Sequence, residues 1–327
     1  MVKAPKMQDI TPRWSHTKLP VLNQNVARIA FGCEALGGYN WGNVDIEAIE
    51  TAIHHVLHQY QDTTTAVLFD TADTYGPHMS EQRLGHALKG RRDRAIVATK
   101  FGVRLDDGVA WYDTSPGYAD RALDASLDRL QVDYIDLYQL HWPDQSTPLV
   151  QSLKALERFR TEGRIRAYGV CNVPPKNILP LIKDFPGLIS YSCNYSLIER
   201  QFESDIKALI KAGMIFLAYG CLAQGLLSGK YDATTRFGEN DRRSNPKYKN
   251  FHNELLQKNL AIVKILTHQA QMKKCSPSTL ALQFVLANLP GSIPLVGIKS
   301  TQQLNQNFAA LKQNLDASVL AHLRELI

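Results

Sequence analysis

The chain has 327 residues, of which 44% are hydrophobic and 21% charged. This balance supports a buried core and excludes a disordered protein. No apolar run reaches the roughly 18 residues of a membrane helix. Residues 1–16 lack the apolar stretch of a secretory signal, so a cytoplasmic location is expected. The five cysteines contain no CxxC pair, which indicates neither a disulfide framework nor a metal site.

The net charge of +6 could indicate nucleic-acid binding, but the basic residues are scattered and only the segment 242–249 supports it, so no nucleic-acid partner is expected. A mild positive field suits a phosphorylated cofactor at least as well.

Short apolar, β-branched runs recur along the chain and predict strands. In chain order they are 27–32, 66–70, 95–100, 134–141, 165–170, 188–193, 214–220 and 292–297. Several are apolar almost throughout, as parallel strands covered on both sides are. The pattern therefore predicts a parallel sheet.

Helical periodicity separates these runs. In 44–60 the apolar residues recur every three or four positions and form one stripe. Ser80, Ser115-Pro116 and Ser276-Pro277 are typical helix starts. Eight strands with intervening helices predict one domain over 1–327, a closed (β/α)8 TIM barrel. The competing doubly wound sheet usually carries a GxGxxG turn after its first strand, and residues 31–38 lack that spacing.

Two segments fall outside the repeat. Residues 18–25 predict a β-hairpin that caps the bottom of the barrel, with its turn at 23–25. Residues 222–250 form a long loop after the seventh strand, rich in Gly, Ser, Asn and basic residues. Loops of this length are usually lids or binding loops.

The active site of such a barrel lies at the carboxyl ends of its strands. Asp70, Lys100 and His141 end the second, third and fourth strands, and Tyr75 follows closely after Asp70. We expect Lys100 to lower the pKa of the phenol and Asp70 to orient the lysine. His141 then donates a hydrogen bond to a carbonyl oxygen. These groups predict general acid catalysis of carbonyl reduction.

At these residues the sequence resembles the aldo-keto reductase superfamily, over nearly the whole chain. The segments that carry the resemblance are FDTADTYG at 69–76, ATKFG at 98–102 and DYIDLYQLHWPD at 133–144. It implies NADPH-dependent carbonyl reduction, with Tyr75 as general acid, Asp70 and Lys100 as its partners and His141 orienting a small carbonyl substrate.

The resemblance also implies the cofactor residues. Asn172 belongs to the nicotinamide clamp, while Cys171 and Ser192 stand where the family has serine and glutamine. Tyr219 matches the ring that stacks on the nicotinamide. The pyrophosphate segment supplies Leu222, Gly225, Leu226, Ser228 and Lys230. The adenosine site supplies Gly297, Lys299, Ser300, Gln303 and Asn307. The Lys299 cation favours the 2′-phosphate of NADPH over NADH.

The substrate walls are predicted to be aromatic residues on loops at the same rim, namely Trp41, Trp111, Tyr112 and Trp142. Cys33, Cys171, Cys193 and Cys221 also lie at strand ends on this face. They indicate either a need for small residues or a rim sensitive to oxidants. The alternative function is a barrel that binds NADP(H) as a sensor, resembling potassium-channel β subunits. The oligomeric state stays open.

Overall fold

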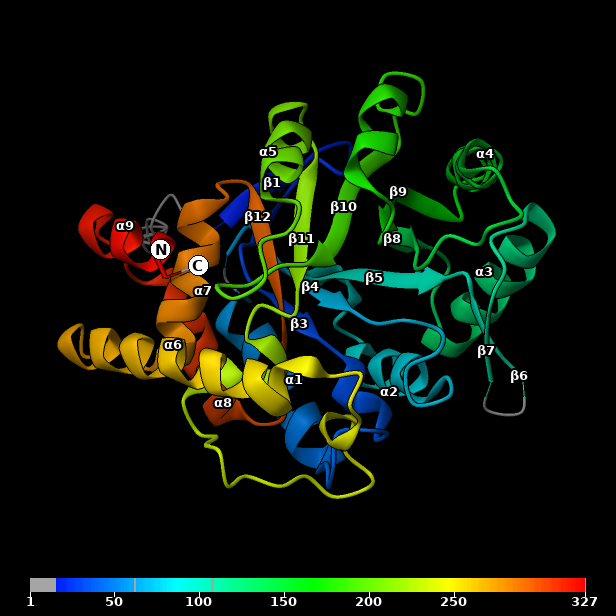
Figure 1. Cartoon of the computed structure of the whole chain (residues 1–327). Coiled ribbons are helices and arrows are strands. Elements are labelled where there is room, and N and C mark those ends of the chain that lie inside the picture. The colour runs from blue at the N-terminus through cyan, green and yellow to red at the C-terminus, as the bar shows by residue number, and fades with distance from the viewer. Residues whose placement is uncertain (1–15, 62, 107–108, 327) are drawn as a thin grey trace, which may run out of the picture.

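The computed structural model describes residues 16–61, 63–106 and 109–326 (Figure 1). Its centre is a ring of parallel strands surrounded by helices. The ring contains β3 (Ala30–Gly32), β4 (Thr65–Asp70), β5 (Ala95–Phe101), β8 (Ile135–Leu140), β9 (Ile165–Cys171), β10 (Leu188–Asn194), β11 (Ile215–Tyr219) and β12 (Ser292–Gly297).

Each of these strands pairs with its neighbours in parallel, and β12 pairs with β3, which closes the ring. The predicted (β/α)8 barrel is thus confirmed, with all its predicted strands. Most predicted strands differ by one residue at one or both ends, and one predicted run is divided. The run 27–32 is not a single strand, because Ala27 ends β2 (Gln24–Ala27) and β3 starts only at Ala30.

Alternating side chains divide the apolar residues into two layers. Leu68, Ala98, Leu137 and Leu217 belong to the cluster inside the ring. Neighbours such as Phe69 belong to the cluster between the ring and the helices. Successive residues of a strand point to opposite faces. Asp70, Lys100 and Gln139 therefore point inward, continuing the inner layer toward the carboxyl ends.

The helices cover the outer layer (Figure 1). They are α1 (Ile46–Gln59), α2 (Met79–Leu88), α3 (Pro116–Leu130), α4 (Leu149–Thr161), α5 (Glu203–Lys211), α6 (Asn253–Met272), α7 (Pro277–Asn288), α8 (Thr301–Phe308) and α9 (Ala317–Arg324). Among the described residues, no helix combines the length and apolarity needed to cross a membrane.

Two of the three predicted helix starts are confirmed. Ser115 and Ser276 cap α3 and α7 by accepting hydrogen bonds from backbone N–H groups three residues on. The prediction for Ser80 is wrong, because α2 already begins at Met79. Ser80 is buried, and its hydroxyl instead donates to the carbonyl of Cys33, 2.7 Å away. The side chain thus joins α2 to the end of β3.

The predicted hairpin is present, with an earlier turn. β1 (His16–Leu19) pairs antiparallel with β2, so the turn spans residues 20–23 rather than 23–25. Leu19, Leu22 and Val26 join the cluster inside the ring. Because β2 pairs with the first residues of β4, these side chains close the amino-terminal end of the barrel. The expectation about a secretory signal concerns residues 1–16, nearly all of which lie outside the described part.

The long loop after the seventh strand is also present, and we call residues 222–250 the β11–α6 segment. It contains two short 3-10 turns, Ala223–Ser228 and Arg242–Ser244, and a third, Lys249–Phe251, begins at its end. It reaches the connection between β3 and α1, where the Arg242 amide donates to the Asn40 carbonyl at 3.0 Å. The Gly42 amide donates to the Asn240 carbonyl at 3.1 Å. These bonds tie the segment across one side of the barrel mouth.

Candidate active site

The structure brings the four predicted catalytic residues together at the carboxyl ends of β4, β5 and β8. The Lys100 ammonium donates to Asp70 Oδ1 at 2.6 Å and to the Thr71 carbonyl at 2.8 Å. It also lies 3.5 Å from the Tyr75 hydroxyl. The Tyr75 and His141 rings meet edge to face, with their centroids 5.9 Å apart. A phenol, an ammonium and an imidazole therefore lie together at one rim of the barrel.

Lys100 and Asp70 form a buried ion pair. Burial alone lowers the pKa of Lys100, but the Asp70 carboxylate, together with Tyr75 and Cys171, raises it above its ordinary value. Lys100 therefore keeps its charge. An uncompensated buried charge is strongly destabilising, so each partner stabilises the other in this position.

The expectation that Lys100 lowers the pKa of Tyr75 below its ordinary value is wrong, because the sum of all contributions raises that pKa. Burial raises the pKa of Tyr75 well above 10.0, and Lys100 opposes this shift without overcoming it. The cause is the desolvation of the phenolate. Lys100 also shares its charge with Asp70. Tyr75 is therefore a neutral phenol that holds its proton.

His141 is a neutral imidazole. Burial and the Lys100 charge lower its pKa well below 6.5. Its Nδ1 is buried and has no hydrogen-bond partner in the structure. Because an unpaired buried polar atom is costly, this nitrogen indicates a site for a polar group that the protein itself does not supply.

Gln139 is a functional candidate that the sequence reading missed. It is buried inside the ring, and its Nε2 lies 3.5 Å from Asp70 Oδ2. Its Oε1 accepts from the Ser190 hydroxyl at 3.4 Å and from the Cys171 thiol at 3.7 Å. One signal was available, since Gln139 precedes His141 by two residues and so shares its face of the strand.

The predicted clamp residues lie beside this group. Asn172 donates from Nδ2 to the His141 carbonyl at 2.8 Å and accepts from the Tyr219 hydroxyl at 2.7 Å. Cys171 and Ser192 are buried, and the Ser192 hydroxyl donates to the Leu217 carbonyl at 2.8 Å. Asn172 and Tyr219 are thus linked to the catalytic group, whereas Ser192 bonds the barrel wall.

The predicted pyrophosphate residues follow β11 and form a tight turn. Gln224 and Gly225 have φ values of 51° and 96°, and the Ser228 hydroxyl donates to the Gly225 carbonyl at 2.6 Å. Leu226 is buried, Leu222 is half-buried and Lys230 is exposed. The Gly225 and Leu227 amides both donate to the Leu222 carbonyl, at 2.9 and 3.1 Å, so the turn is closed by its own backbone bonds and Lys230 is the cation that follows it.

The predicted adenosine residues follow β12. Gly297 ends that strand, Ser300 caps α8, and Gln303 accepts from the Lys299 amide at 2.9 Å. Asn307 is buried within the same helix. The Lys299 ammonium donates to the Trp41 carbonyl at 2.6 Å. Burial lowers the pKa of Lys299, with the charges of Arg243 and Lys230 adding to the shift. Lys230, Arg243 and Lys299 are therefore close enough at the barrel mouth for their charges to interact.

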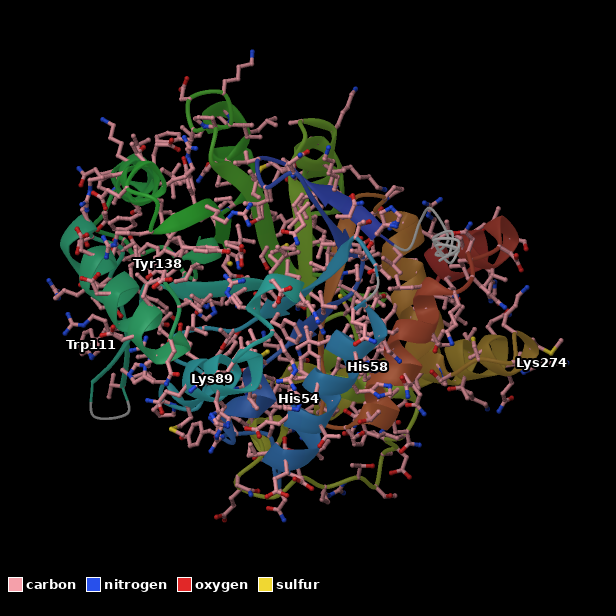
Figure 2. All side chains as sticks on the ribbon, turned by 180° about the vertical axis from the view of Figure 1, so that it is seen from behind. His54, His58, Lys89, Trp111, Tyr138 and Lys274 are labelled. Atoms are coloured by element: carbon pink, nitrogen blue, oxygen red, sulfur yellow. The ribbon has the colours of Figure 1, made fainter. Side chains whose placement is uncertain are left out.

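The predicted substrate aromatics do not form a single wall. Trp111 and Tyr112 belong to a second hairpin, β6 (Val103–Asp106) with β7 (Val109–Tyr112), which the sequence reading did not predict. Tyr112 contacts Trp142, with ring centroids 6.3 Å apart. Trp111 lies on the opposite face of β7 and is 57% exposed, at the edge of the molecule in Figure 2. Trp41 lies elsewhere, under the β11–α6 segment.

The four cysteines at the strand ends are buried free thiols. Burial raises the pKa of Cys33, Cys171, Cys193 and Cys221. Reaction with oxidants requires the thiolate and access to solvent. The structure therefore favours the interpretation that these strand ends need small residues.

A closed barrel with this polar group at its carboxyl ends defines an enzyme site. The sequence model of the aldo/keto reductase family matches residues 28–327. The chain is 30% identical over 311 residues to the NADP(+) aldo-keto reductase yakc of Schizosaccharomyces pombe, covering 93% of this chain and 89% of the relative. The chain therefore belongs to the aldo/keto reductase family and is an oxidoreductase.

Solved structures agree with this assignment. The glycerol dehydrogenase of Gluconobacter oxydans superposes with a TM-score of 0.85 at 29% identity, covering 96% of this chain and 95% of that one. The holo form of an aldo-keto reductase from Bacillus halodurans gives a TM-score of 0.75 at 27% identity, covering 95% and 96%.

Proposed function

We propose that this oxidoreductase reduces aldehydes or ketones to alcohols with NADPH, and that Tyr75 supplies the proton. The observation that carries the proposal is the position of the Lys100 ammonium, 2.6 Å from Asp70 Oδ1 and 3.5 Å from the Tyr75 hydroxyl. A positioned proton donor contributes about 10²–10⁴-fold to such a reaction.

The residues at the barrel mouth fit a phosphorylated dinucleotide. The turn at Gln224 and Gly225 follows β11 at the mouth, and the Lys230 cation comes shortly after it. Lys230 and Lys299 supply positive charge in the same region, whereas the charge of Arg243 is paired with the Asp241 carboxylate. Tyr219 is half-buried at the end of β11 and offers a ring face. NADPH would supply the hydride when bound. We assign its phosphates to the turn and the lysines, and its nicotinamide to Asn172 and Tyr219.

In this proposal the side chains of the protein bind and protonate the carbonyl oxygen of the substrate. The neutral His141 imidazole and the Tyr75 hydroxyl hold the carbonyl oxygen by hydrogen bonds. As negative charge develops on that oxygen, the Tyr75 proton moves to it and completes the alcohol. The Lys100 ammonium stabilises the phenolate that remains, because it lies within hydrogen-bonding distance of the phenol oxygen. Asp70 and Gln139 position the lysine.

The preference for NADPH over NADH rests on Lys299. A 2′-phosphate needs a charged partner, and Lys299 supplies an ammonium directly before the start of α8. Its present bond to the Trp41 carbonyl keeps the ammonium on the cofactor side of the mouth.

An assay of the purified protein tests the reaction class. Propanal, benzaldehyde and a ketone are each mixed with NADPH, and the loss of nicotinamide absorbance is followed. We expect turnover of at least one aldehyde. An NADP(H)-binding sensor would bind NADPH and show no hydride transfer with any of them, which would contradict the proposal.

A further inference from the structure

An ion pair at the barrel mouth lies outside the catalytic group just described. Arg242 Nη1 lies 2.5 Å from Glu34 Oε1. Glu34 comes directly after the end of β3, whereas Arg242 belongs to the β11–α6 segment, so residues far apart in sequence form the pair. The two side chains are 28% and 23% exposed. The pair therefore remains accessible to a small molecule.

The backbone holds Glu34 next to the loop that carries Tyr75. Cys33 donates its amide to the Asp70 carbonyl at 2.8 Å. Gly37 and Gly76 are in such close contact that a Cβ on Gly76 would lie 2.2 Å from the Gly37 carbonyl oxygen. The short turn that starts at Glu34 is thus packed directly on the residue that follows Tyr75.

Electrostatics agree with this placement. Besides burial, the Glu34 charge contributes to raising the pKa of Tyr75. The phenol in turn is among the groups that raise the pKa of Arg242, after Glu34 and Tyr248. The ion pair and the proton donor are therefore coupled electrostatically.

Arg242 retains unused hydrogen-bonding capacity. Its guanidinium lies 4.9 Å from the centre of the Trp41 ring and 5.8 Å from that of Tyr248, so aromatic rings fix its orientation. Its backbone amide is bonded to Asn40. Its Nε is buried and has no partner in the structure. A fixed donor and a neighbouring carboxylate acceptor together suit a hydroxyl group, which both donates and accepts.

We propose that Glu34 and Arg242 are specificity-determining residues that select neutral, hydroxylated carbonyl compounds. The inference rests on the proposed function, since it concerns the substrate of the same site. The pair carries no net charge, so Glu34 offsets the attraction of Arg242 for an anionic substrate. A site that hydrogen-bonds a hydroxyl discriminates against the analogue that lacks it, because its polar groups are then left unpaired.

Three aldehydes of similar size test the proposal with NADPH: glyceraldehyde, propanal and the anionic glyoxylate. For the wild type we expect a higher kcat/KM for glyceraldehyde than for propanal. Arg242→Gln should lower the ratio of these two values by about tenfold or more, the effect of losing a hydrogen bond to a charged group. Glu34→Gln leaves Arg242 uncompensated and should raise kcat/KM for glyoxylate by about tenfold.

Arg236→Gln is the matched control. Arg236 lies on the same segment, is exposed and bonds only nearby backbone carbonyls in its own turn. The Arg236→Gln variant should leave the ratios of kcat/KM among the three aldehydes unchanged. The Kd of NADPH, measured by fluorescence titration for every variant, detects an effect through the cofactor site.

Two outcomes overturn the inference while leaving the proposed function intact. One is an equal loss of kcat/KM for glyceraldehyde and propanal in Arg242→Gln. This result would mean that Arg242 only holds the β11–α6 segment in place. The other is unchanged glyoxylate reduction in Glu34→Gln. If the wild type turns over none of the three aldehydes, the proposed function itself fails and the inference fails with it.

Discussion

At the scale of single residues, the site depends on three side chains with shifted protonation. Burial and Lys100 keep His141 neutral, while burial keeps the proton on Tyr75. Asp70 keeps the charge on Lys100. Each group therefore stays in the state that carbonyl reduction requires at neutral pH. Opposite shifts of neighbouring groups are typical of acid–base sites.

The pH profile of the reaction follows from these directions. The pKa of His141 is lowered, so the imidazole is protonated only well below pH 6.5. The pKa of Tyr75 is raised, so its proton is lost only above pH 10.0. We expect kcat/KM for propanal at saturating NADPH to stay flat between about pH 6 and 9. An inflection near pH 6.5 that disappears in His141→Asn would contradict this assignment.

The positions of Asp70, Lys100 and His141 could be predicted from the sequence because strand ends meet at one rim. The protonation states of these side chains could not be predicted from the sequence. The sign of the Tyr75 shift depends on the balance between desolvation and the Lys100 charge, and only the structure shows how deeply the phenol is buried. The spacing of Gln139 from His141 indicates a shared face, but it does not reveal that the amide bonds Asp70 and Ser190.

At the scale of elements, close contacts between backbones fix the loops around the site. Gly85 in α2 is one example. A Cβ at this position would lie 2.4 Å from the Leu130 carbonyl oxygen at the end of α3. The two helices can approach this closely only because residue 85 has no side chain. Since α2 follows the Tyr75 loop directly, this packing also anchors that loop.

Gly85→Ala should therefore destabilise the protein. Alanine is favoured over glycine in a helix by about 1 kcal/mol, but the collision with Leu130 should reverse the sign and cost about 1–3 kcal/mol net. Urea denaturation measures the free energy of unfolding. Gly117→Ala in α3 is the control, because the nearest atom to its Cβ would be Arg121 Nη1 at 3.9 Å. Equal effects of the two substitutions would show that helix propensity alone decides.

Most elements could be predicted from periodicity, and the errors have local causes. The run 27–32 predicts one strand because apolar residues continue on both sides of Arg28, where β2 gives way to β3. Ser80 suggests a cap, yet its hydroxyl bonds Cys33, a contact distant in sequence. The hairpin of β6 and β7 did carry a signal, since Asp107-Gly108 is a typical hairpin dipeptide.

At the scale of the whole molecule, the barrel collects residues from strands and loops spread along the chain onto one face. This arrangement could be predicted because parallel strands joined by helices place all their carboxyl ends together. The sequence does not predict the link from the β11–α6 segment to the β3–α1 connection. This link depends on backbone hydrogen bonds at Asn40 and Gly42. The spacing of apolar residues does not indicate hydrogen bonds between the backbones of two loops.

Binding of the cofactor should stabilise the folded chain as a whole. A ligand at 100 times its Kd stabilises the native state by about 2.7 kcal/mol. NADPH should therefore raise the Tm more than NADH at equal concentration. Lys299→Met should abolish most of the difference, because the charged partner of the 2′-phosphate is lost. Differential scanning fluorimetry measures both shifts, and equal shifts by the two nucleotides in the wild type would refute the preference.

The central claim is that Tyr75 supplies the proton, and Tyr75→Phe tests it most directly. Phenylalanine keeps the ring that contacts His141 and removes only the hydroxyl beside Lys100. Steady-state reduction of propanal is measured together with the Kd of NADPH. We predict that kcat/KM falls by about 10²–10⁴-fold while the Kd stays within about threefold. A variant that binds NADPH normally and keeps most of its turnover would contradict the account.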